Sequence, residues 1–474
     1  MKAAERPPGS FAFWPPAQPR PRERILATTG RAGELLIGAE VIVVDSWHSF
    51  KEALEERNLE VFAPPLPGWR WWQEAAADPA AFVVLGKEAS PRAIVVQGRR
   101  RRHWIVDAAV WHRKPDAALL RDLRRVAEAT GVGIWGTPAR TGDAMQRHDW
   151  RAECGRRLES RPNDRGRTML LEGGVGGRGQ TFLPGLVTPA AWEIDQRDAY
   201  AAAWARPKPT GRAMVTHDAT RLRGGEVTAF GPVRWRISRR LECPGPLAVR
   251  KADGNLAWPT EPGTYQGYAW HEECQDARSC LVEVEPAGPG VAWSAWVQSD
   301  LWTRRMSEAR RQAGGWGSLL KLCTVAAIGR HGRKPEGWTA VEEPQQGDVG
   351  FSPEGQQYGR RAVDLPSMSH WYGYALMLAR RTVWHRAVAE QWGGRRIVAL
   401  ETDSVILDGP PLGPVVHRGD DLPGEWSVRH AGEDCYTPLT RWAIWGDGSG
   451  RTPGLPRAYR AAWLLEHPPP GPSG

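Results

Sequence analysis

Two stretches of the 474-residue sequence decide its fold: AAWEIDQRDAY at residues 190–200 and RIVALETDSVIL at residues 396–407. In the first stretch an apolar strand ends at Asp195. In the second, two short apolar strands flank Glu401 and Asp403, a pattern typical of a tight hairpin that carries acids at its tip. The sequence therefore predicts strand-end acids in two distant parts of the chain.

Acids placed in this way are what a two-metal site for phosphoryl transfer requires. Such a site holds two divalent cations roughly 3.5–4 Å apart. These hard cations take oxygen ligands, which here would be carboxylates from separate segments of the chain. An aspartate after a strand is also a common turn former or helix cap, so the residues around Asp195 and Asp403 must decide.

Residues 195–200, DQRDAY, resemble motif A of the family B DNA polymerases, Asp-x-x-Ser-Leu-Tyr-Pro, particularly in the compact protein-primed branch of phages and linear elements. The resemblance implies that Asp195 binds both metals. It also implies that Tyr200 lies beneath the incoming sugar, where its ring excludes a 2′-hydroxyl. Asp198 stands in place of the usual serine, and Ala201 in place of the usual proline.

Residues 321–329, KLCTVAAIG, are similar to motif B of the same family, Lys-x-x-x-Asn-Ser-x-Tyr-Gly. The similarity implies that Lys321 faces the phosphates of the nucleotide and that Gly329 belongs to the same nucleotide-binding segment. A compact ammonium group suits a triphosphate. Val325 and Ile328 replace the expected asparagine and tyrosine, so weaker contacts to the base pair and the nucleotide are expected.

Residues 401–404, ETDS, are similar to motif C, Tyr-x-Asp-Thr-Asp-Ser. Asp403 matches the indispensable second aspartate, Glu401 stands at the first, and Ala399 replaces the tyrosine. The resemblance thus implies that Asp195 and Asp403 are the catalytic acids. With Glu401 they would hold two Mg²⁺ (or Mn²⁺) ions.

Two further segments are implied to contact DNA by their positions relative to these motifs. Gly176, Gly177 and Arg178 look like the glycine-rich segment that joins the exonuclease and polymerase domains in the protein-primed branch and touches the single-stranded template. Arg441, in an apolar stretch after motif C, stands where the family has a basic residue that contacts the primer.

The charge balance agrees with a polyanionic partner. Lysine and arginine total 63 against 54 acids, a formal net charge of +9, which favours nucleic acid. Nearly all of these cations are arginine, and a high-GC genome also enriches arginine, so this bias has a second explanation. Arg310 and Arg311, one helix before Lys321, are candidates for further nucleotide-phosphate contacts, and a solvated surface is the alternative.

The expected fold class is α+β: a polymerase palm with an antiparallel sheet, plus fingers and thumb elements, preceded by an α/β remnant of an RNase H-like exonuclease domain. Helices are predicted at residues 117–130, 318–328 and 367–391. The predicted division is a disordered tail at 1–25, the amino-terminal domain at 26–165, palm with motif A at 166–296, fingers at 297–366, palm helix and motif C at 367–415, a thumb-like region at 416–462, and a second disordered tail at 463–474.

No complete exonuclease site is expected in the amino-terminal part. Proofreading relatives begin with Asp-x-Glu on a strand, whereas the comparable strand here ends in Asp45 followed by Ser46 and Trp47. Further acids are isolated, at Asp107, Asp122 and Asp143. The sequence therefore predicts a protein without 3′→5′ activity.

Six scattered cysteines and the lack of a signal-peptide pattern favour a reducing cytoplasm, that of a bacterial host for a phage or mobile-element protein. No apolar run approaches the ~20 residues of a membrane span. A zinc site formed by Cys243, His271, Cys274 and Cys280 stays open, although their spacing matches no standard signature and ordinary thiols are favoured.

The function expected from these features is template-directed DNA synthesis without proofreading, with primer-template DNA and dNTPs as partners and a terminal protein as a further candidate. Two alternatives stay open. One is a polymerase-derived DNA-binding replication protein with weakened catalysis, and the other is a primase-like or terminal-transferase variant.

Overall fold

The computed structural model describes residues 25–29, 34–37, 40–78, 80–85, 91–98, 102–154, 169–170, 173, 178–211, 213–251, 256–332, 336–339, 349–351, 357–362, 369–416, 422–439, 442–452, 455, 459, 464 and 466. The chain forms two compact units. Unit 1 comprises Met1–Leu158 and Leu301–Ser367, and unit 2 comprises Glu159–Asp300 and Met368–Gly474. The predicted disordered tails lie outside the described residues, except that Ile25 begins the first strand and residues 464 and 466 are described.

Unit 1 is built on a mixed seven-stranded sheet with the order β3-β2-β1-β4-β7-β6-β5. Strands β1 and β4, and β4 and β7, pair in parallel, and the remaining pairs are antiparallel. The strands are β1 (Ile25–Thr29), β2 (Leu35–Ile37), β3 (Glu40–Ile42), β4 (Leu59–Ala63), β5 (Ala81–Leu85), β6 (Pro91–Gln97) and β7 (Arg102–Asp107). Tryptophan supplies much of the core on one side, where Trp47 and Trp69 pack with Phe50.

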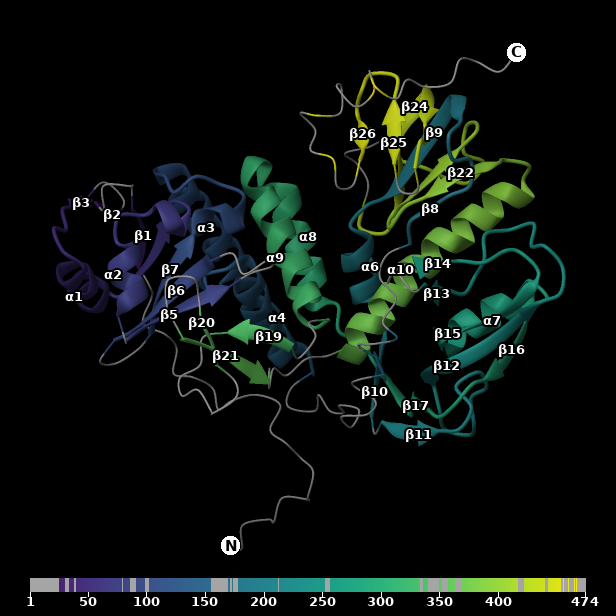
Figure 1. The fold of residues 1–474 in the computed structure, drawn as a ribbon, viewed down its shortest axis with the longest axis horizontal. Helices are drawn as coiled ribbons and strands as arrows, with labels where there is room; N and C mark the ends of the chain where they lie inside the picture. Colours follow the sequence, from purple (N-terminus) through teal and green to yellow (C-terminus); the bar gives the residue numbers. More distant parts are fainter. Residues whose placement is uncertain are drawn as a thin grey trace, which may run out of the picture. The chain divides into compact units, whose positions relative to one another are not determined.

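Helices account for the rest of the described part of unit 1, together with short 3₁₀ turns and a small sheet. The helices are α1 (Trp47–Arg57), α2 (Trp72–Ala77), α3 (Ala117–Thr130), α4 (Pro138–Cys154), α8 (Leu301–Gln312) and α9 (Gly317–Arg330). The turns are η1 (Leu66–Gly68), η3 (Ala108–Trp111) and η4 (Gly314–Trp316), and the sheet pairs β19 (Glu336–Thr339), β21 (Gln357–Ala362) and β20 (Val349–Phe351). In Figure 1, α4, α8 and α9 pack side by side.

The predicted helix 117–130 has the predicted bounds, because both of its ends are specified locally. Asp116 accepts a hydrogen bond from the backbone N–H of Leu119 at 2.9 Å, which caps the first turn. Gly131 ends the helix with φ = 64°, a left-handed conformation that favours glycine. Helix α9 packs closely on α4, since a Cβ at Gly142 would lie 2.2 Å from the Cys323 carbonyl oxygen.

The strand predicted to end in Asp45 is shorter, and its last residue is Ile42. This strand, β3, lies at the edge of the sheet, whereas β1 lies inside it between β2 and β4. The Asp45 carboxylate accepts a hydrogen bond from the Ser49 hydroxyl at 3.0 Å and thus supports the start of α1. The five residues of β1 carry no carboxylate.

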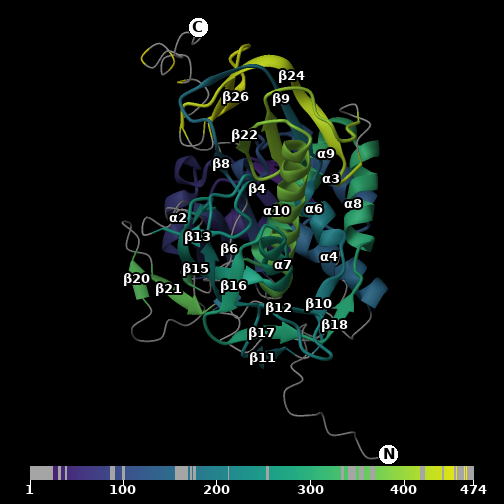
Figure 2. The same ribbon diagram turned by 90° about the vertical axis from the view of Figure 1, so that its right-hand side faces the viewer.

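Unit 2 contains an antiparallel seven-stranded sheet with the order β26-β25-β24-β9-β23-β22-β8. Its strands are β8 (Gln180–Thr181), β9 (Val187–Gln196), β22 (Ile397–Leu400), β23 (Ser404–Leu407), β24 (Trp426–Tyr436), β25 (Ala443–Trp445) and β26 (Gly450–Arg451). The long helix α10 (Ser369–Trp392) lies against this sheet, where Val383 and Ala387 pack with Ile194 (Figure 2). The short helix α6 (Ala199–Ala205) follows β9 directly.

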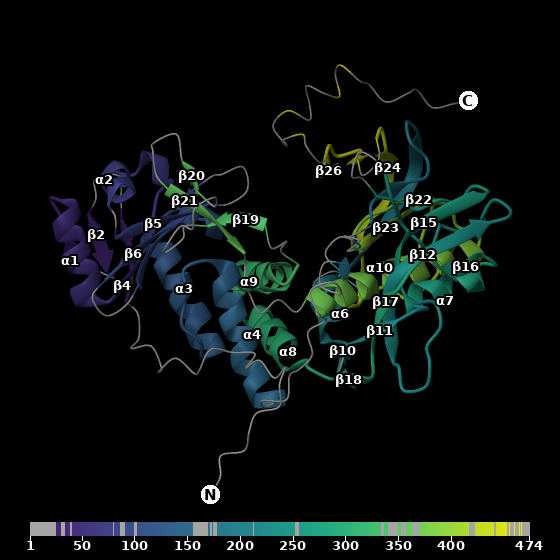
Figure 3. The same ribbon diagram turned by 60° about the horizontal axis from the view of Figure 1, so that its bottom comes forward.

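Unit 2 has a second layer, a sheet whose strands lie between residues 214 and 293. Strands β11 (Met214–Thr216), β17 (Gly290–Trp293), β12 (Thr228–Ile237), β15 (Gly263–Trp270) and β16 (Glu283–Pro286) form one sheet, on which α7 (His271–Ser279) packs (Figure 3). Two short pairs accompany it, β10 (Lys208–Thr210) with β18 (Ala295–Val297) and β13 (Val249–Arg250) with β14 (Leu256–Ala257). In the part of the chain that the structure describes, no helix has the length and apolarity needed to cross a membrane.

Candidate active site

A two-residue hairpin turn brings the predicted acids to neighbouring strands. The Glu401 N–H donates to the Ser404 carbonyl oxygen at 2.9 Å and closes the β22–β23 hairpin. Strand β23 pairs with β9 so that Ser404 stands opposite Asp195. The Gln196 N–H donates to the Asp403 carbonyl oxygen at 2.7 Å. Asp195 and Asp403, more than two hundred residues apart in sequence, therefore lie at the same end of adjacent strands.

The electrostatics of Asp195 reflect this approach. Burial and, after it, the negative charge of Asp403 raise the pKa of Asp195 to about 6, although Arg429 and Arg451 act in the opposite direction. Its Oδ1 atom is buried and accepts no hydrogen bond from the described residues. A carboxylate oxygen held in this way costs free energy unless a cation compensates it.

The other acid of the hairpin is less accessible. Glu401 is 5 % exposed, whereas the Asp403 side chain is 40 % exposed. Both carboxylates raise the pKa of the Arg451 guanidinium, so they lie in one electrostatic environment. The structure thus brings together Asp195, Asp403 and Glu401, and presents Asp403 most openly to solvent.

Tyr200 lies beside the hairpin tip. The chain turns sharply at Asp198, which has φ = 47°, a conformation that aspartate tolerates better than most residues. This turn begins α6 and brings the Tyr200 hydroxyl near Thr402. Burial, with the neighbouring Tyr372 and Asp403, raises the pKa of Tyr200 to about 12. The phenol is therefore neutral, and its ring forms one side of the site. Its contact with a sugar stays a prediction.

Three charged residues of the site were not predicted from the sequence. Glu193 precedes Asp195 by two positions, so both side chains point to the same face of β9. Arg429, from β24, faces both acids at 3.6–3.7 Å. Arg451, from β26, lies 3.8 Å from Asp195 and donates to the Glu193 carboxylate. The alternation along β9 could have indicated Glu193, but the arginines carry no local signal because sheet pairing alone brings them here.

The donor set fits a divalent cation that a substrate helps to hold. Among the described residues, no three His, Cys, Asp or Glu side chains are grouped so as to hold a metal by themselves. Mg²⁺, however, is usually bound by one or two carboxylates together with water and substrate phosphates. Asp195, with its unsatisfied oxygen, and the open Asp403 meet that requirement. Their assignment as metal ligands stays a proposal.

The motif B residues belong to unit 1, where α9 presents Lys321, Val325 and Gly329 on one exposed face. Ile328, at the position of the expected tyrosine, is buried in unit 1. Arg310 is half-buried. The contact of Lys321 with a nucleotide at the acids of unit 2 stays a prediction.

Arg311 fits the solvated alternative more readily than a buried phosphate site. Its side chain is exposed and pairs with Glu308 on the same helix. An exposed pair of this kind contributes little to stability. The predicted contact of Arg311 with phosphates stays untested.

Of the predicted DNA contacts, Arg178 is described and lies buried at 1 % exposure. Its guanidinium donates to the Gly245 carbonyl oxygen at 2.9 Å and to the Gln180 side chain, and lies 5.0 Å from the Trp258 ring. Burial lowers its pKa to about 9. In this conformation Arg178 joins segments of unit 2, and its contact with template stays a prediction. Gly176, Gly177 and Arg441 lie outside the described residues.

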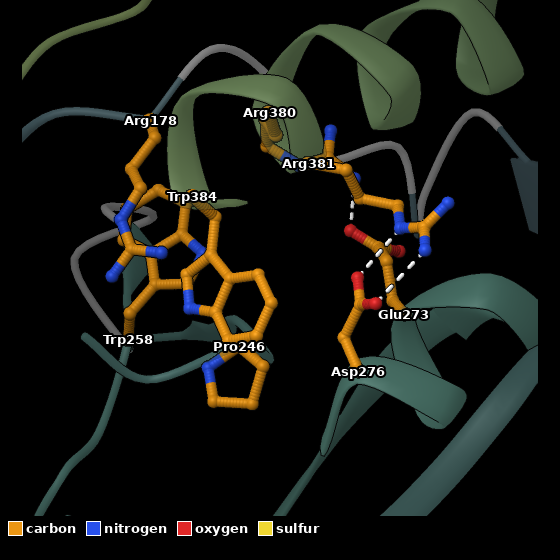
Figure 4. A pocket seen from close by; sticks show the side chains of 8 residues that line it. All are labelled: Arg178, Pro246, Trp258, Glu273, Asp276, Arg380, Arg381 and Trp384. Carbon is orange, nitrogen blue, oxygen red and sulfur yellow. Dashed lines mark hydrogen bonds and ion pairs between the residues drawn. The ribbon is translucent and has the colours of Figure 1, made fainter. Parts of the chain in front are cut away.

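Arg178 also lines a small pocket, which does not include Asp195, Asp403 or Glu401 (Figure 4). On the opposite wall two ion pairs join α10 to α7: Arg380 with Glu273 at 2.7 Å, and Arg381 with Asp276 at 2.5 Å. The remaining lining residues are Pro246, Trp258 and Trp384. Because its acids and most of its arginines are already paired, this pocket is a structural junction rather than a metal site.

The suggested zinc cluster is not formed among the described residues. Cys243 and Cys280 approach each other, with sulfur atoms 3.5 Å apart. Cys274, on α7 itself, is fully buried in the core. The favoured interpretation as ordinary thiols stays a prediction.

The fold is similar to that of solved DNA polymerase structures. The chain matches phi29 DNA polymerase complexed with primer-template DNA and incoming nucleotide substrates at a TM-score of 0.70, with 11 % identity and 93 % of each chain covered. A complex of phi29 DNA polymerase with single-stranded DNA matches at a TM-score of 0.60 and 12 % identity, covering 90 % of this chain and 88 % of that one.

At this level of identity the likeness establishes the fold alone. No protein-family model matches the sequence, and no curated protein matches it. The predicted α+β class, with an amino-terminal sheet domain and an antiparallel palm-type sheet, is confirmed. The exact limits of palm, fingers and thumb stay predictions.

Proposed function

We propose that this chain is a template-directed DNA polymerase that transfers nucleotidyl groups from dNTPs to a primer 3′-hydroxyl. The observation that carries the proposal is the meeting of Asp195 and Asp403 on adjacent strands, within the fold of a known DNA polymerase. A fold alone supports many functions, so the site must carry the argument. Here the sequence motifs and the spatial arrangement point to the same two acids.

The chain's own residues have distinct roles in this proposal. Asp195 and Asp403 hold divalent cations, Mg²⁺ or Mn²⁺, with Glu401 close by. When bound, two such ions lower the barrier by activating the primer oxygen and neutralising the developing phosphate charge. Tyr200 limits the space beneath the sugar of the nucleotide. Lys321 supplies a positive charge to the phosphates. Gly329, with open space around its Cα on the same exposed face of α9, belongs to the same nucleotide-binding segment.

The partners that follow are primer-template DNA and dNTPs, with a terminal protein as a further candidate. The net charge of +9 supports a nucleic-acid partner. The bacterial cytoplasm, entered with a phage or mobile element, is the proposed location. Synthesis without proofreading belongs to the same proposal.

Primer extension with Mg²⁺ or Mn²⁺ tests the proposal, on wild type and on Asp195→Asn and Asp403→Asn. We expect extension by wild type and its loss in both variants, because neutral amides bind divalent cations poorly. Asp434→Asn is the matched control, since Asp434 lies exposed on β24 of the same sheet. Wild type that binds DNA but incorporates nothing would overturn the proposal. Extension that survives loss of either acid would overturn the site assignment.

A second candidate function is a polymerase-derived DNA-binding protein with weakened catalysis. Its support is in α9, where Val325 is exposed at the position of the expected asparagine and Ile328 is buried. Apolar groups there cannot replace the hydrogen bonds of asparagine and tyrosine. DNA binding without incorporation in the same assay would favour this candidate. A primase-like or terminal-transferase activity would instead appear as synthesis without a primer or without a template.

A further inference from the structure

Arg451 lies within 4 Å of three acids of unit 2, Glu193, Asp195 and Asp403. Its Nη2 donates to the Ser404 hydroxyl at 3.0 Å and to the Glu193 carboxylate. The same guanidinium lies 3.8 Å from Asp195 Oδ1 and 3.8 Å from Asp403 Oδ1. One side chain thus spans both proposed metal ligands, and within the described part of the chain its hydrogen bonds go to Glu193 and Ser404 beside them.

The backbone around Arg451 fixes this placement. Strand β26 pairs with β25 so that Arg451 stands opposite Ala443. The preceding Gly450 has φ = 137°, and a Cβ there would lie 2.0 Å from the Ala443 carbonyl oxygen. Only glycine permits such a close approach. Pairing of β26 at the edge of the sheet, rather than a flexible loop, therefore holds the guanidinium beside the acids.

Glu193 provides the anchor for the guanidinium. It is 3 % exposed and lies on the same face of β9 as Asp195. A buried carboxylate requires a partner, and besides Arg451 it has Arg429 at 3.7 Å and His430 at 3.9 Å. Arg429 reaches Asp195 at 3.6 Å from a bulge of β24. Of the two arginines, only Arg451 reaches both Asp195 and Asp403.

We propose that Arg451, anchored on Glu193, is a fixed counter-charge that screens the two acids in the metal-free protein and weakens their affinity for a free divalent cation. This inference rests on the proposed function, since it takes Asp195 and Asp403 as the metal ligands. The distances support screening rather than blockage, because the oxygens of both acids stay outside hydrogen-bonding range of Arg451. A cation would then bind firmly only when triphosphate oxygens complete its coordination and offset the repulsion.

Binding of Mn²⁺ alone, measured by titration calorimetry at pH 8 without DNA or nucleotide, tests the inference. Removing a unit charge a few ångströms from the cation is expected to tighten binding by about tenfold in Arg451→Gln. Arg451→Lys keeps the charge and should retain an affinity near that of wild type. Arg396→Gln is the matched control, because Arg396 forms an exposed pair with Asp408 at the other end of the β22–β23 hairpin.

The outcomes separate this inference from the proposed function. Unchanged or weaker Mn²⁺ binding in Arg451→Gln would overturn the inference, as would equal tightening in Arg451→Lys. If Arg451→Gln does not fold, the same charge is removed in a Glu193→Gln background: Glu193→Gln/Arg451→Gln should bind Mn²⁺ about tenfold more tightly than Glu193→Gln alone. Should Mn²⁺ bind equally well to wild type and to Asp195→Asn/Asp403→Asn, the metal site of the proposed function would fail instead.

Discussion

The two seven-stranded sheets of this molecule differ in what surrounds the buried glutamate of their fourth strand. In unit 1, Glu60 of β4 is fully buried and stands opposite Leu26 of β1. In unit 2, Glu193 of β9 has Asp195 on the same face and Asp403 at the adjoining hairpin. Burial of an acid is therefore not by itself evidence of a functional site. Acids become a candidate site where neighbouring strands end together and a hairpin adds a second carboxylate.

The largest effect on primer extension is expected from Asp403, the acid in the hairpin turn of unit 2. Asp403→Asn should lower the rate of primer extension by roughly a thousandfold, since metal-assisted charge stabilisation is worth several kcal/mol. Asp107→Asn, at the end of β7 in unit 1, should retain wild-type extension, because asparagine also caps the following turn. Steady-state extension assays measure both. Comparable losses in the two variants would remove the distinction between the sheets.

The pH dependence of stability should differ in sign between the units, beginning with Asp195. Its folded pKa, about 6, lies above the ordinary value of 3.8. Its contribution to stability is therefore fully present below pH ~4 and is lost as pH rises through about 6. In EDTA at pH 7.5, Asp195→Asn should raise the free energy of unfolding of unit 2 by about 2 kcal/mol. Urea denaturation checks this, and a destabilised variant would contradict it.

Unit 1 should show the opposite dependence through His331. This residue ends α9, is buried, and pairs with the Gln146 side chain at 2.8 Å. Burial lowers the pKa of His331 to about 4 from 6.5. Its contribution is present above pH 6.5 and is lost as pH falls toward 4, by about 2 kcal/mol at pH 5. Urea denaturation of wild type and His331→Gln at pH 5 and pH 7.5 tests this. Equal pH dependence in the two proteins would rule His331 out.

The smallest effect is expected from the acids of the amino-terminal sheet. A labelled, mismatched primer incubated with Mg²⁺ and no nucleotide should keep its length, because the interior strand β1 carries no carboxylate and Asp45 only supports the start of α1. Gel electrophoresis over hours provides the measurement. Metal-dependent shortening that Asp45→Ala abolishes would show that the sheet of unit 1 carries a metal-dependent site as well.

Features that depend on residues close together in the sequence were predictable. The bounds of α3 follow from the cap at Asp116 and the stop at Gly131. The hairpin with acids at its tip follows from two apolar runs separated by a short polar turn. The edge position of β3 was not predictable, because a strand's apolar pattern does not reveal which neighbours it pairs with.

The same division applies to the candidate site. The sequence by itself indicated Asp195, Asp403, Glu401 and Tyr200 as candidates, since each belongs to a motif whose strand or turn is specified locally. Only the tertiary structure decided that Glu193, Arg429 and Arg451 join them. Pairing of β9 with β24, and of β25 with β26, brings these charges to the acids from segments far away in sequence. Long-range sheet pairing depends on packing of the whole unit, so no short stretch of sequence encodes it.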